Sequence, residues 1–232
     1  MATNYNPKIV TDGLVLCLDA ANTKSYPGSG TTWTDVSGKG YDATLTSTNL
    51  SNGPTFNSDY GGNIVFDGNT NGEEITGVHN SELNLRNDVT VECWFRRTGG
   101  RSDWVRIFGK GDSSNRTYGL WYHVNSNYFL YQRYGPSSFN IMPSKSVVLN
   151  AWYHMVGTSS GSTHTLYVNG VNMGTQSNSS TFHSSTSPYK IGYGNTHQIH
   201  KGNVSNCRIY NRGLSEAEVK QNYNAHKGRF GL

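Results

Sequence analysis

The sequence is poor in charged residues and in long apolar runs, and each scarcity excludes a class of protein. Only 15% of the 232 residues are charged, and 19 basic against 15 acidic residues leave a net charge of +4. Because nucleic-acid surfaces are denser in basic residues than this, we expect no nucleic-acid partner. No apolar run approaches membrane-spanning length, and the first ten residues lack a signal-peptide pattern. We therefore expect neither membrane insertion nor a leader.

Cysteine is also scarce. The chain has three cysteines, an odd number that cannot all pair within one molecule. Cys17, Cys93 and Cys207 each lie inside a β-prone run. We therefore expect buried free thiols that behave as small hydrophobic groups, and folding in a reducing compartment.

Aromatic residues, glycine and small polar residues are abundant, and aromatics alone make up 12% of the chain. Short β-prone runs separated by turn residues predict an all-β sandwich or barrel and not a βαβ sheet. Asn169 and Gly170 tolerate positive φ and predict a hairpin turn between apolar flanks. The clearest β-prone runs span residues 13–20, 63–68, 89–97, 104–110, 118–124, 127–134, 152–159, 164–170, 189–194 and 203–211.

A helical pattern is found at the end of the sequence. Ser215 is a good N-cap, and Glu218, three residues later, completes a capping box. Gly228 can take the left-handed conformation that ends a helix. We therefore expect a short helix over about 216–226. Its expected apolar face comprises Val219, Tyr223 and Ala225 or His226.

Four blocks of the sequence resemble concanavalin A-like lectin/glucanase domains of the laminin G-like type. They read DGLVLCLDAANTKSYPGSGTTWTDVSGKGYDATLT, IVFDG, WYHMVGTSSGSTHTLYVNG and VSNCRIYNRGLSEAEVKQNYNAHKGRFG, and the resemblance spans about residues 8–231. It implies a jelly-roll sandwich of two antiparallel sheets with one short C-terminal helix. We expect residues 1–232 to form a single domain of this kind, with an N-terminal arm at 1–8.

The opening block and the ending QNYNAHKGRFG look most like those of phage and environmental-virus virion proteins. This resemblance implies a non-enzymatic structural protein of the virion, assembled in the host cytoplasm, that serves as a head decoration, fibre or tail-adhesin module. Its partners would be other virion proteins, cell-surface glycan or both, and we expect a homo-oligomer. The alternative is a carbohydrate-binding lectin module, with or without calcium, and a more remote alternative is a glycoside hydrolase.

The acidic residues argue against the hydrolase. Glycosidases of this superfamily carry alternating carboxylates on one strand, so that two of them flank the scissile bond. Glu92 is alone in its run, and adjacent Glu73 and Glu74 would point to opposite faces of a strand. His197 and His200 lack a nearby third ligand for zinc. We therefore assign no catalytic residue.

No cofactor is required by the sequence, and calcium is the one candidate. The resemblance to laminin G-like domains implies oxygen-ligand calcium sites at loops, and Asp19, Asp35 and Asp67 lie in the matching blocks. The alternative is that these aspartates cap turns, because TDVSG and FDGN are ordinary Asx-turn sequences.

The densest aromatic stretch, residues 118–134, predicts a hairpin with two different faces. Alternation along the first strand places Leu120 on the core face and Trp121 and His123 on the other face. The second strand then contributes one of two sets beside them, Tyr131 with Arg133 or Gln132 with Tyr134.

A second aromatic and basic cluster is centred on Trp104. Exposed Trp, Tyr and Arg are typical of interface hot spots, and the rings also suit stacking on sugars. The alternative is that the rings pair across strands and only cover the sheet. The predicted contact residues for glycan or a protein partner are Trp104, Trp121, His123, Tyr131, Arg133, Tyr134, Arg101 and Arg106.

Overall fold

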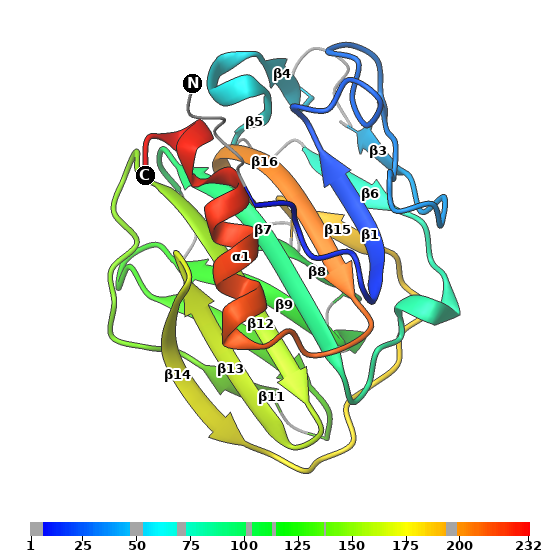
Figure 1. The fold of residues 1–232 in the computed structure, drawn as a ribbon, viewed down its shortest axis with the longest axis vertical. Coiled ribbons are helices and arrows are strands. Elements are labelled where there is room, and N and C mark those ends of the chain that lie inside the picture. The colour runs from blue at the N-terminus through cyan, green and yellow to red at the C-terminus, as the bar shows by residue number, and fades with distance from the viewer. Residues whose placement is uncertain are drawn as a thin grey trace.

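Two antiparallel sheets of eight strands each make up most of the regular structure (Figure 1). The computed structural model describes residues 7–46, 53–68, 73–100, 104–112, 115–136, 138–193 and 199–232. The strands of the first sheet, called sheet A, are in spatial order β14 (Val171–Ser177), β13 (Thr163–Val168), β12 (Trp152–Ser160), β7 (Val89–Arg97), β16 (Lys201–Tyr210), β5 (Asn63–Asp67) and β4 (Thr55–Asn57), with β1 (Leu14–Asp19) paired to β16. Those of sheet B are β11 (Ser138–Ile141), β10 (Phe129–Tyr134), β9 (Tyr118–His123), β8 (Trp104–Lys110), β15 (Tyr189–Ile191), β6 (Glu74–Gly77), β3 (Ala43–Thr46) and β2 (Thr32–Trp33).

The hydrophobic core lies between the two sheets, because alternate residues of each strand point inward. In β7 the inward residues Val91, Cys93 and Phe95 belong to this core, whereas Trp94 belongs to a separate cluster on the outer face. The same alternation in β9 directs Leu120 into the core. The predicted jelly-roll sandwich is confirmed.

The predicted hairpin turn at the end of β13 is confirmed. Asn169 and Gly170 have φ values of 53° and 74°, and β13 and β14 pair as antiparallel neighbours on either side of them. Both residues therefore take the left-handed conformation that a tight turn between twisted strands requires.

One α-helix, α1 (Glu216–His226), covers the outer face of sheet A (Figure 1). Ser215 and Glu218 form the predicted capping box. Val219 is fully buried in a cluster with Val156 of β12 and Tyr210 of β16, which attaches the helix to the sheet. The 3₁₀ helices among the described residues include η1 (Asp59–Gly61), η2 (Ser81–Leu83) and η4 (Lys227–Phe230).

The predicted helix stop at Gly228 is wrong. The chain continues from α1 directly into η4, and the left-handed residue is Gly231, with φ of 70°. The extra turn places Phe230 against Trp94 and Trp152 on the outer face of sheet A. Packing of this aromatic ring explains why the helical path extends beyond the first available glycine.

The three cysteines are free and buried, as predicted. Burial raises the pKa of each thiol, most strongly for Cys93 and Cys207. These thiols therefore pack as apolar groups. Within the described ranges, no helix combines the length and the apolar character needed to cross a membrane.

Candidate functional site

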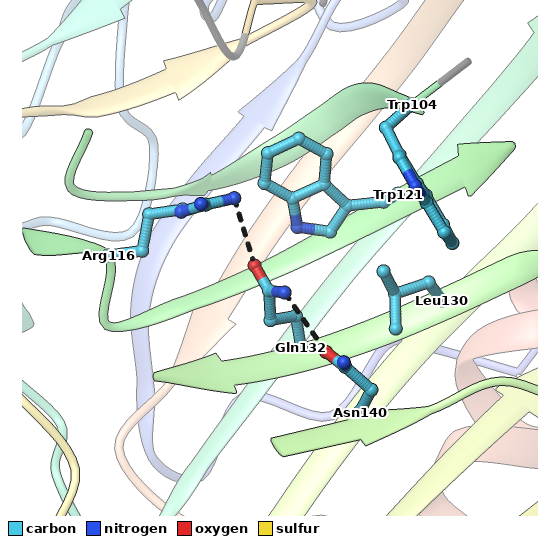
Figure 2. A pocket seen from close by; sticks show the side chains of 6 residues that line it. All are labelled: Trp104, Arg116, Trp121, Leu130, Gln132 and Asn140. Atoms are coloured by element: carbon cyan, nitrogen blue, oxygen red, sulfur yellow. Dashed lines mark hydrogen bonds between the residues drawn. The ribbon is translucent and has the colours of Figure 1, made fainter. Parts of the chain in front are cut away.

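A groove of about 260 Å³ lies on the outer face of sheet B, the face that points away from sheet A (Figure 2). Strands β8 to β11 and the loop before β9 supply its walls. We call it the tryptophan groove, and its lining residues are Trp104, Arg116, Trp121, Leu130, Gln132 and Asn140.

Strand register explains why these residues meet. Trp121 of β9 pairs with Leu130 of β10, and Gln132 of β10 pairs with Asn140 of β11. Paired residues on neighbouring strands point to the same face, so these side chains gather on the outer face. Gly119 is required there, because a Cβ at this position would lie 2.8 Å from Nε1 of Trp121.

The two tryptophans have different roles in the groove. Trp121 forms its floor and is only 2% exposed. Trp104 is partly exposed, and its ring meets that of His123 edge to face, with centroids 4.7 Å apart. Trp104 is therefore the ring that a ligand can reach directly.

A row of hydrogen-bonded polar side chains crosses the groove (Figure 2). Nη1 of Arg116 donates to Oε1 of Gln132 at 3.2 Å, and Nε2 of Gln132 donates to Oδ1 of Asn140 at 3.0 Å. We call these three residues the polar row. Because Asn140 is exposed, the row leads from the groove floor to solvent.

Two guanidinium groups lie beside the floor. The Cζ atoms of Arg106 and Arg116 are 5.5 and 5.2 Å from the centroid of the Trp121 ring. Arg106 is 1% exposed and donates to the carbonyl oxygens of Tyr193 and Gly111. Burial, with the charge of Arg116, lowers the pKa of Arg106 to about 10.

The structure brings four of the predicted contact residues together, namely Trp104, Trp121, His123 and Arg106. Tyr134 is half-buried, and Cζ of Arg116 lies 5.3 Å from its ring centroid. Arg101 lies outside the described residues.

Tyr131 and Arg133 are not at the surface. Tyr131 pairs with Leu120, and both point into the core, where the Tyr131 hydroxyl hydrogen-bonds to Oγ of Ser159 at 2.7 Å. Arg133 is fully buried and donates to the carbonyl oxygen of Leu85. Of the two sets left open by the sequence, the one beside Trp121 is therefore Gln132 with Tyr134.

The site also contains residues that were not among the predicted contacts. Gln132 belongs to one of the two sets that the sequence left open, whereas the sequence did not predict Arg116, Leu130 and Asn140 as contacts. Arg116 precedes its strand in a loop, and Asn140 lies on a strand of only four residues. Neither position has a periodic signal in the sequence.

The three candidate calcium ligands have separate surroundings. Asp19 pairs with Nη1 of Arg229 at 3.1 Å. Asp35 accepts hydrogen bonds from the backbone amides of Cys17 and Ser37, as the turn alternative predicts. Within the part of the chain that the structure describes, no three His, Cys, Asp or Glu side chains gather as a metal site. Asp19, Asp35 and Asp67 therefore do not meet at one point, and calcium binding by any one of them together with amide or carbonyl oxygens stays a prediction.

Asp67 belongs to a carboxyl pair. The backbone amide of Asp67 donates to Oε2 of Glu73 at 2.9 Å. Burial first, and then the Asp67 side chain, raises the pKa of Glu73 to about 8. Glu73 is only 1% exposed, and neither residue lines the groove. The pair therefore lacks the open cleft between carboxyl groups that a glycosidase needs.

A second concentration of ionisable groups lies beneath α1 on sheet A. Glu92 is fully buried, and its Oε1 accepts from Nη1 of Arg208 at 2.6 Å and lies 3.3 Å from Nε2 of His154. Its Oε2 accepts from Asn222 of α1. Burial opposes ionisation, but His154 and Arg208 outweigh it and hold the pKa of Glu92 far below its usual range. This network attaches the helix and offers no access to a ligand.

Several solved structures have the same fold. One is the binding domain of Paraclostridial Mosquitocidal Protein 1, with a TM-score of 0.73 and 18% identity, covering 93% of this chain and 52% of that one. Trypanosoma rangeli sialidase in complex with the inhibitor DANA has a TM-score of 0.69 and 19% identity, and the likeness covers 95% of this chain and 35% of the sialidase. This chain thus spans about half of the first protein and about a third of the second.

Domain 4 of AbnA, a GH43 extracellular arabinanase from Geobacillus stearothermophilus in complex with arabinotriose, is similar to this chain over almost its whole length. Its TM-score is 0.70 with 16% identity, and the likeness covers 90% of this chain and 98% of the domain. At such identities, the likeness to all three structures shows the fold alone.

No protein of curated function matches the sequence. The family model described as the concanavalin A-like lectin/glucanases superfamily matches residues 67–220, well over half of the chain. The matched range includes every strand that forms the tryptophan groove. The chain belongs to the concanavalin A-like lectin/glucanases superfamily.

Proposed function

We propose that this domain is a non-catalytic glycan-binding module and that the tryptophan groove is its binding site. One observation carries the proposal: a partly exposed tryptophan and a row of hydrogen-bonding side chains occupy the same groove on the outer face of sheet B. A ligand site of this kind combines an apolar wall with a few oriented polar groups.

The chemistry of sugars matches both parts of the groove. One face of a pyranose ring carries mainly C–H groups, which stack on an aromatic face such as that of Trp104. The ring hydroxyls then need hydrogen-bond partners, and the polar row supplies amide and guanidinium groups for them.

The composition of the groove supports binding without hydrolysis. None of the six described residues that line it carries a carboxylate. Glycoside hydrolysis needs two carboxyl groups about 5 to 10 Å apart across the scissile bond. Similar structures named as a binding domain, and as a domain in complex with arabinotriose, add support from the fold.

Replacing Trp104 with alanine tests the proposal. A glycan array with the unaltered protein identifies a ligand, and calorimetry then measures its affinity for the Trp104→Ala variant. We expect binding to weaken about tenfold or more, since loss of a central aromatic contact costs over 1 kcal/mol. Stability should change little, because the ring is partly exposed.

The matched control is Tyr60→Ala. Tyr60 is also an exposed aromatic residue, at 39%, but it packs near Trp152 and Phe230 on the outer face of sheet A. Its loss should leave glycan affinity unchanged. Repeating the array with calcium and with a chelator tests the calcium requirement. Absence of binding in both buffers, or equal losses in the two variants, would contradict the proposal.

We further propose that the module acts in a virion, as a head decoration, fibre or tail adhesin. The support is the similarity of the opening block and of the ending QNYNAHKGRFG to virion proteins. Light scattering after size exclusion should show a homo-oligomer, and the protein should sediment with purified phage particles. A monomer that does not bind phage particles would contradict the virion proposal, and the glycan-binding proposal would be unaffected.

A further inference from the structure

The hydrogen-bond directions in the polar row are determined by Arg116. A guanidinium group has donors and no acceptor, so the atom of Gln132 that faces it must be Oε1. Nε2 of Gln132 is then directed to Asn140, and the atom of Asn140 that receives it must be Oδ1. The Nδ2 group of exposed Asn140 is consequently turned away from the row. The row thus uses its acceptors internally and presents N–H groups to a ligand.

Two further N–H donors near the groove floor have no acceptor among the described residues. They are Nε1 of Trp121, which lines the groove, and Nη2 of Arg106, whose guanidinium lies beside the Trp121 ring. Both residues are at least nine-tenths buried. A buried donor without an acceptor is destabilising, and an electron-rich ligand in the groove would supply one. Among the described residues, Nε1 of Trp33, Trp94 and Trp152 likewise has no acceptor, so such donors are not specific to the groove.

The described lining of the groove carries positive charge and no acidic side chain, while the carboxylates of Asp112 and Glu74 act on Arg106 from outside the lining. Arg106 and Arg116 bring positive charge to the floor and the wall, and none of the six described lining residues is acidic. Elsewhere on the same outer face, Lys190 is neutralised by Glu74 at 2.9 Å. Burial of Arg106 strengthens the attraction of an anion to it, because little water screens this guanidinium, whereas Arg116 is half-buried and reachable from solvent.

We propose, building on the glycan-binding function above, that the tryptophan groove takes a saccharide unit that carries a carboxylate. The carboxylate accepts from Arg116 and from Nδ2 of Asn140, while the sugar ring lies against Trp104. The groove volume of about 260 Å³ suits one such unit. Uronic and sialic acids share this chemistry, and a carboxylate offers only acceptors to the donors of the groove.

Matched pairs of ligands test the proposal. Calorimetry compares sialyllactose with lactose, and trigalacturonate with its methyl ester, at low and high salt. We expect the acidic member of at least one pair to bind roughly tenfold or more tightly, as a charge-assisted hydrogen bond implies. The preference should shrink with salt, since part of it is electrostatic. The pair that shows the preference identifies the acid as sialic or uronic.

Variants of Arg116 connect the preference to the groove. Arg116→Gln should remove the preference for the acidic ligand while the neutral ligand still binds, and Arg116→Lys should restore part of it. Lys190→Gln is the matched control, because it removes the same charge from the same sheet face but from a residue that does not line the groove. It should leave the preference intact.

The outcomes separate this proposal from the function on which it rests. Equal binding of acidic and neutral ligands would overturn the acidic preference and leave glycan binding in place. Absence of binding to any glycan would overturn both. Equal loss of acidic and neutral binding in Arg116→Gln would also overturn the proposal, because the arginine would then only hold the groove in shape.

Discussion

The outer faces of the two sheets both contain tryptophans, but Trp94 on sheet A is fully buried whereas Trp104 on sheet B is partly exposed. On sheet A, Trp94 is fully buried, with the ring of Phe230 4.3 Å away and that of Tyr223 5.7 Å away. On sheet B, Trp104 is partly exposed at the edge of a groove. The C-terminal segment from α1 to η4 accounts for the difference, because it packs on sheet A.

The arginines differ in the same way. Arg208 on sheet A meets Glu92 at 2.6 Å, and Arg229 meets Asp19 at 3.1 Å, so charges of opposite sign are matched within the chain. In the tryptophan groove, Arg106 donates to backbone carbonyls and Arg116 donates to an amide. Carboxylates thus form ion pairs with the arginines on sheet A, whereas the groove arginines hydrogen-bond to neutral oxygens of the described residues.

The largest predicted effect concerns the outer face of sheet A beneath α1 and η4, which we call the covered face. Glu92→Gln leaves Arg208 buried beside a neutral group, and loss of one partner from a buried ion pair costs about 3–5 kcal/mol. Urea unfolding at pH 7 should show this loss. The matched control is Glu74→Gln on sheet B, which removes a more accessible pair with Lys190 and should cost at most about 1 kcal/mol. Equal losses would show that the two faces are not energetically different.

A pH titration of the free energy of unfolding tests how much the protonation of a buried core histidine destabilises the fold. His200 is fully buried, and its Nδ1 hydrogen-bonds to the hydroxyl of Tyr122. Burial lowers the pKa of His200 to about 4, so the unfolded chain takes up a proton at a higher pH than the folded one does. Stability should therefore be retained above about pH 6.5 and fall by about 3 kcal/mol as the pH drops to 4.

Burial also lowers the pKa of His226 on the covered face, which should add to this loss. The carboxylates of that face should not contribute, because ion pairs hold the pKa values of Glu92 and Asp19 well below their usual range. Their stabilisation is present above the unfolded pKa and is lost only as the pH falls through the depressed folded values. Urea unfolding between pH 7 and 4 should thus show a shallower pH dependence in His200→Gln. An unchanged slope would place the acid-sensitive groups elsewhere.

A smaller effect concerns the groove floor. Gly119→Ala places a Cβ 2.8 Å from Nε1 of Trp121 and forces the indole to move. We expect a loss of about 1–3 kcal/mol from overpacking, together with weaker glycan binding. Gly174→Ala is the control, because its Cβ would meet Ile141 at an ordinary 3.4 Å. Unchanged binding in Gly119→Ala would show that the position of Trp121 is not needed.

Local signals in the sequence predicted the long strands, the turn at Asn169 and Gly170, and the capped helix. Each depends on residues close together in the chain, so sequence alone determines it. Strands such as β2, with only Thr32 and Trp33, are too short to show periodicity. Their pairing comes from the neighbouring strand, and no local pattern predicts it.

The candidate site was predictable only in part for the same reason. Alternation in β9 placed Trp121 on the outer face, but its neighbours depend on which residue of β10 pairs with it. That register makes Leu130 and Gln132 the neighbours and sends Tyr131 into the core. Arg116 enters the groove from a loop, where alternation gives no information. The sequence thus predicted which side of a strand each side chain points to, whereas it did not predict which residues of neighbouring strands contact each other.

The smallest predicted effect tests how the C-terminal segment reaches the covered face. A Cβ at Gly228 meets nothing within 4 Å, so Gly228→Ala should stabilise the fold by about 0.5 kcal/mol by restricting the unfolded chain. Gly231→Ala should instead cost about 1 kcal/mol, because φ at this residue is 70°. Thermal unfolding distinguishes the two. If Gly228→Ala were the destabilising variant, the left-handed turn would lie before Phe230, and that ring would not cover Trp94 as described.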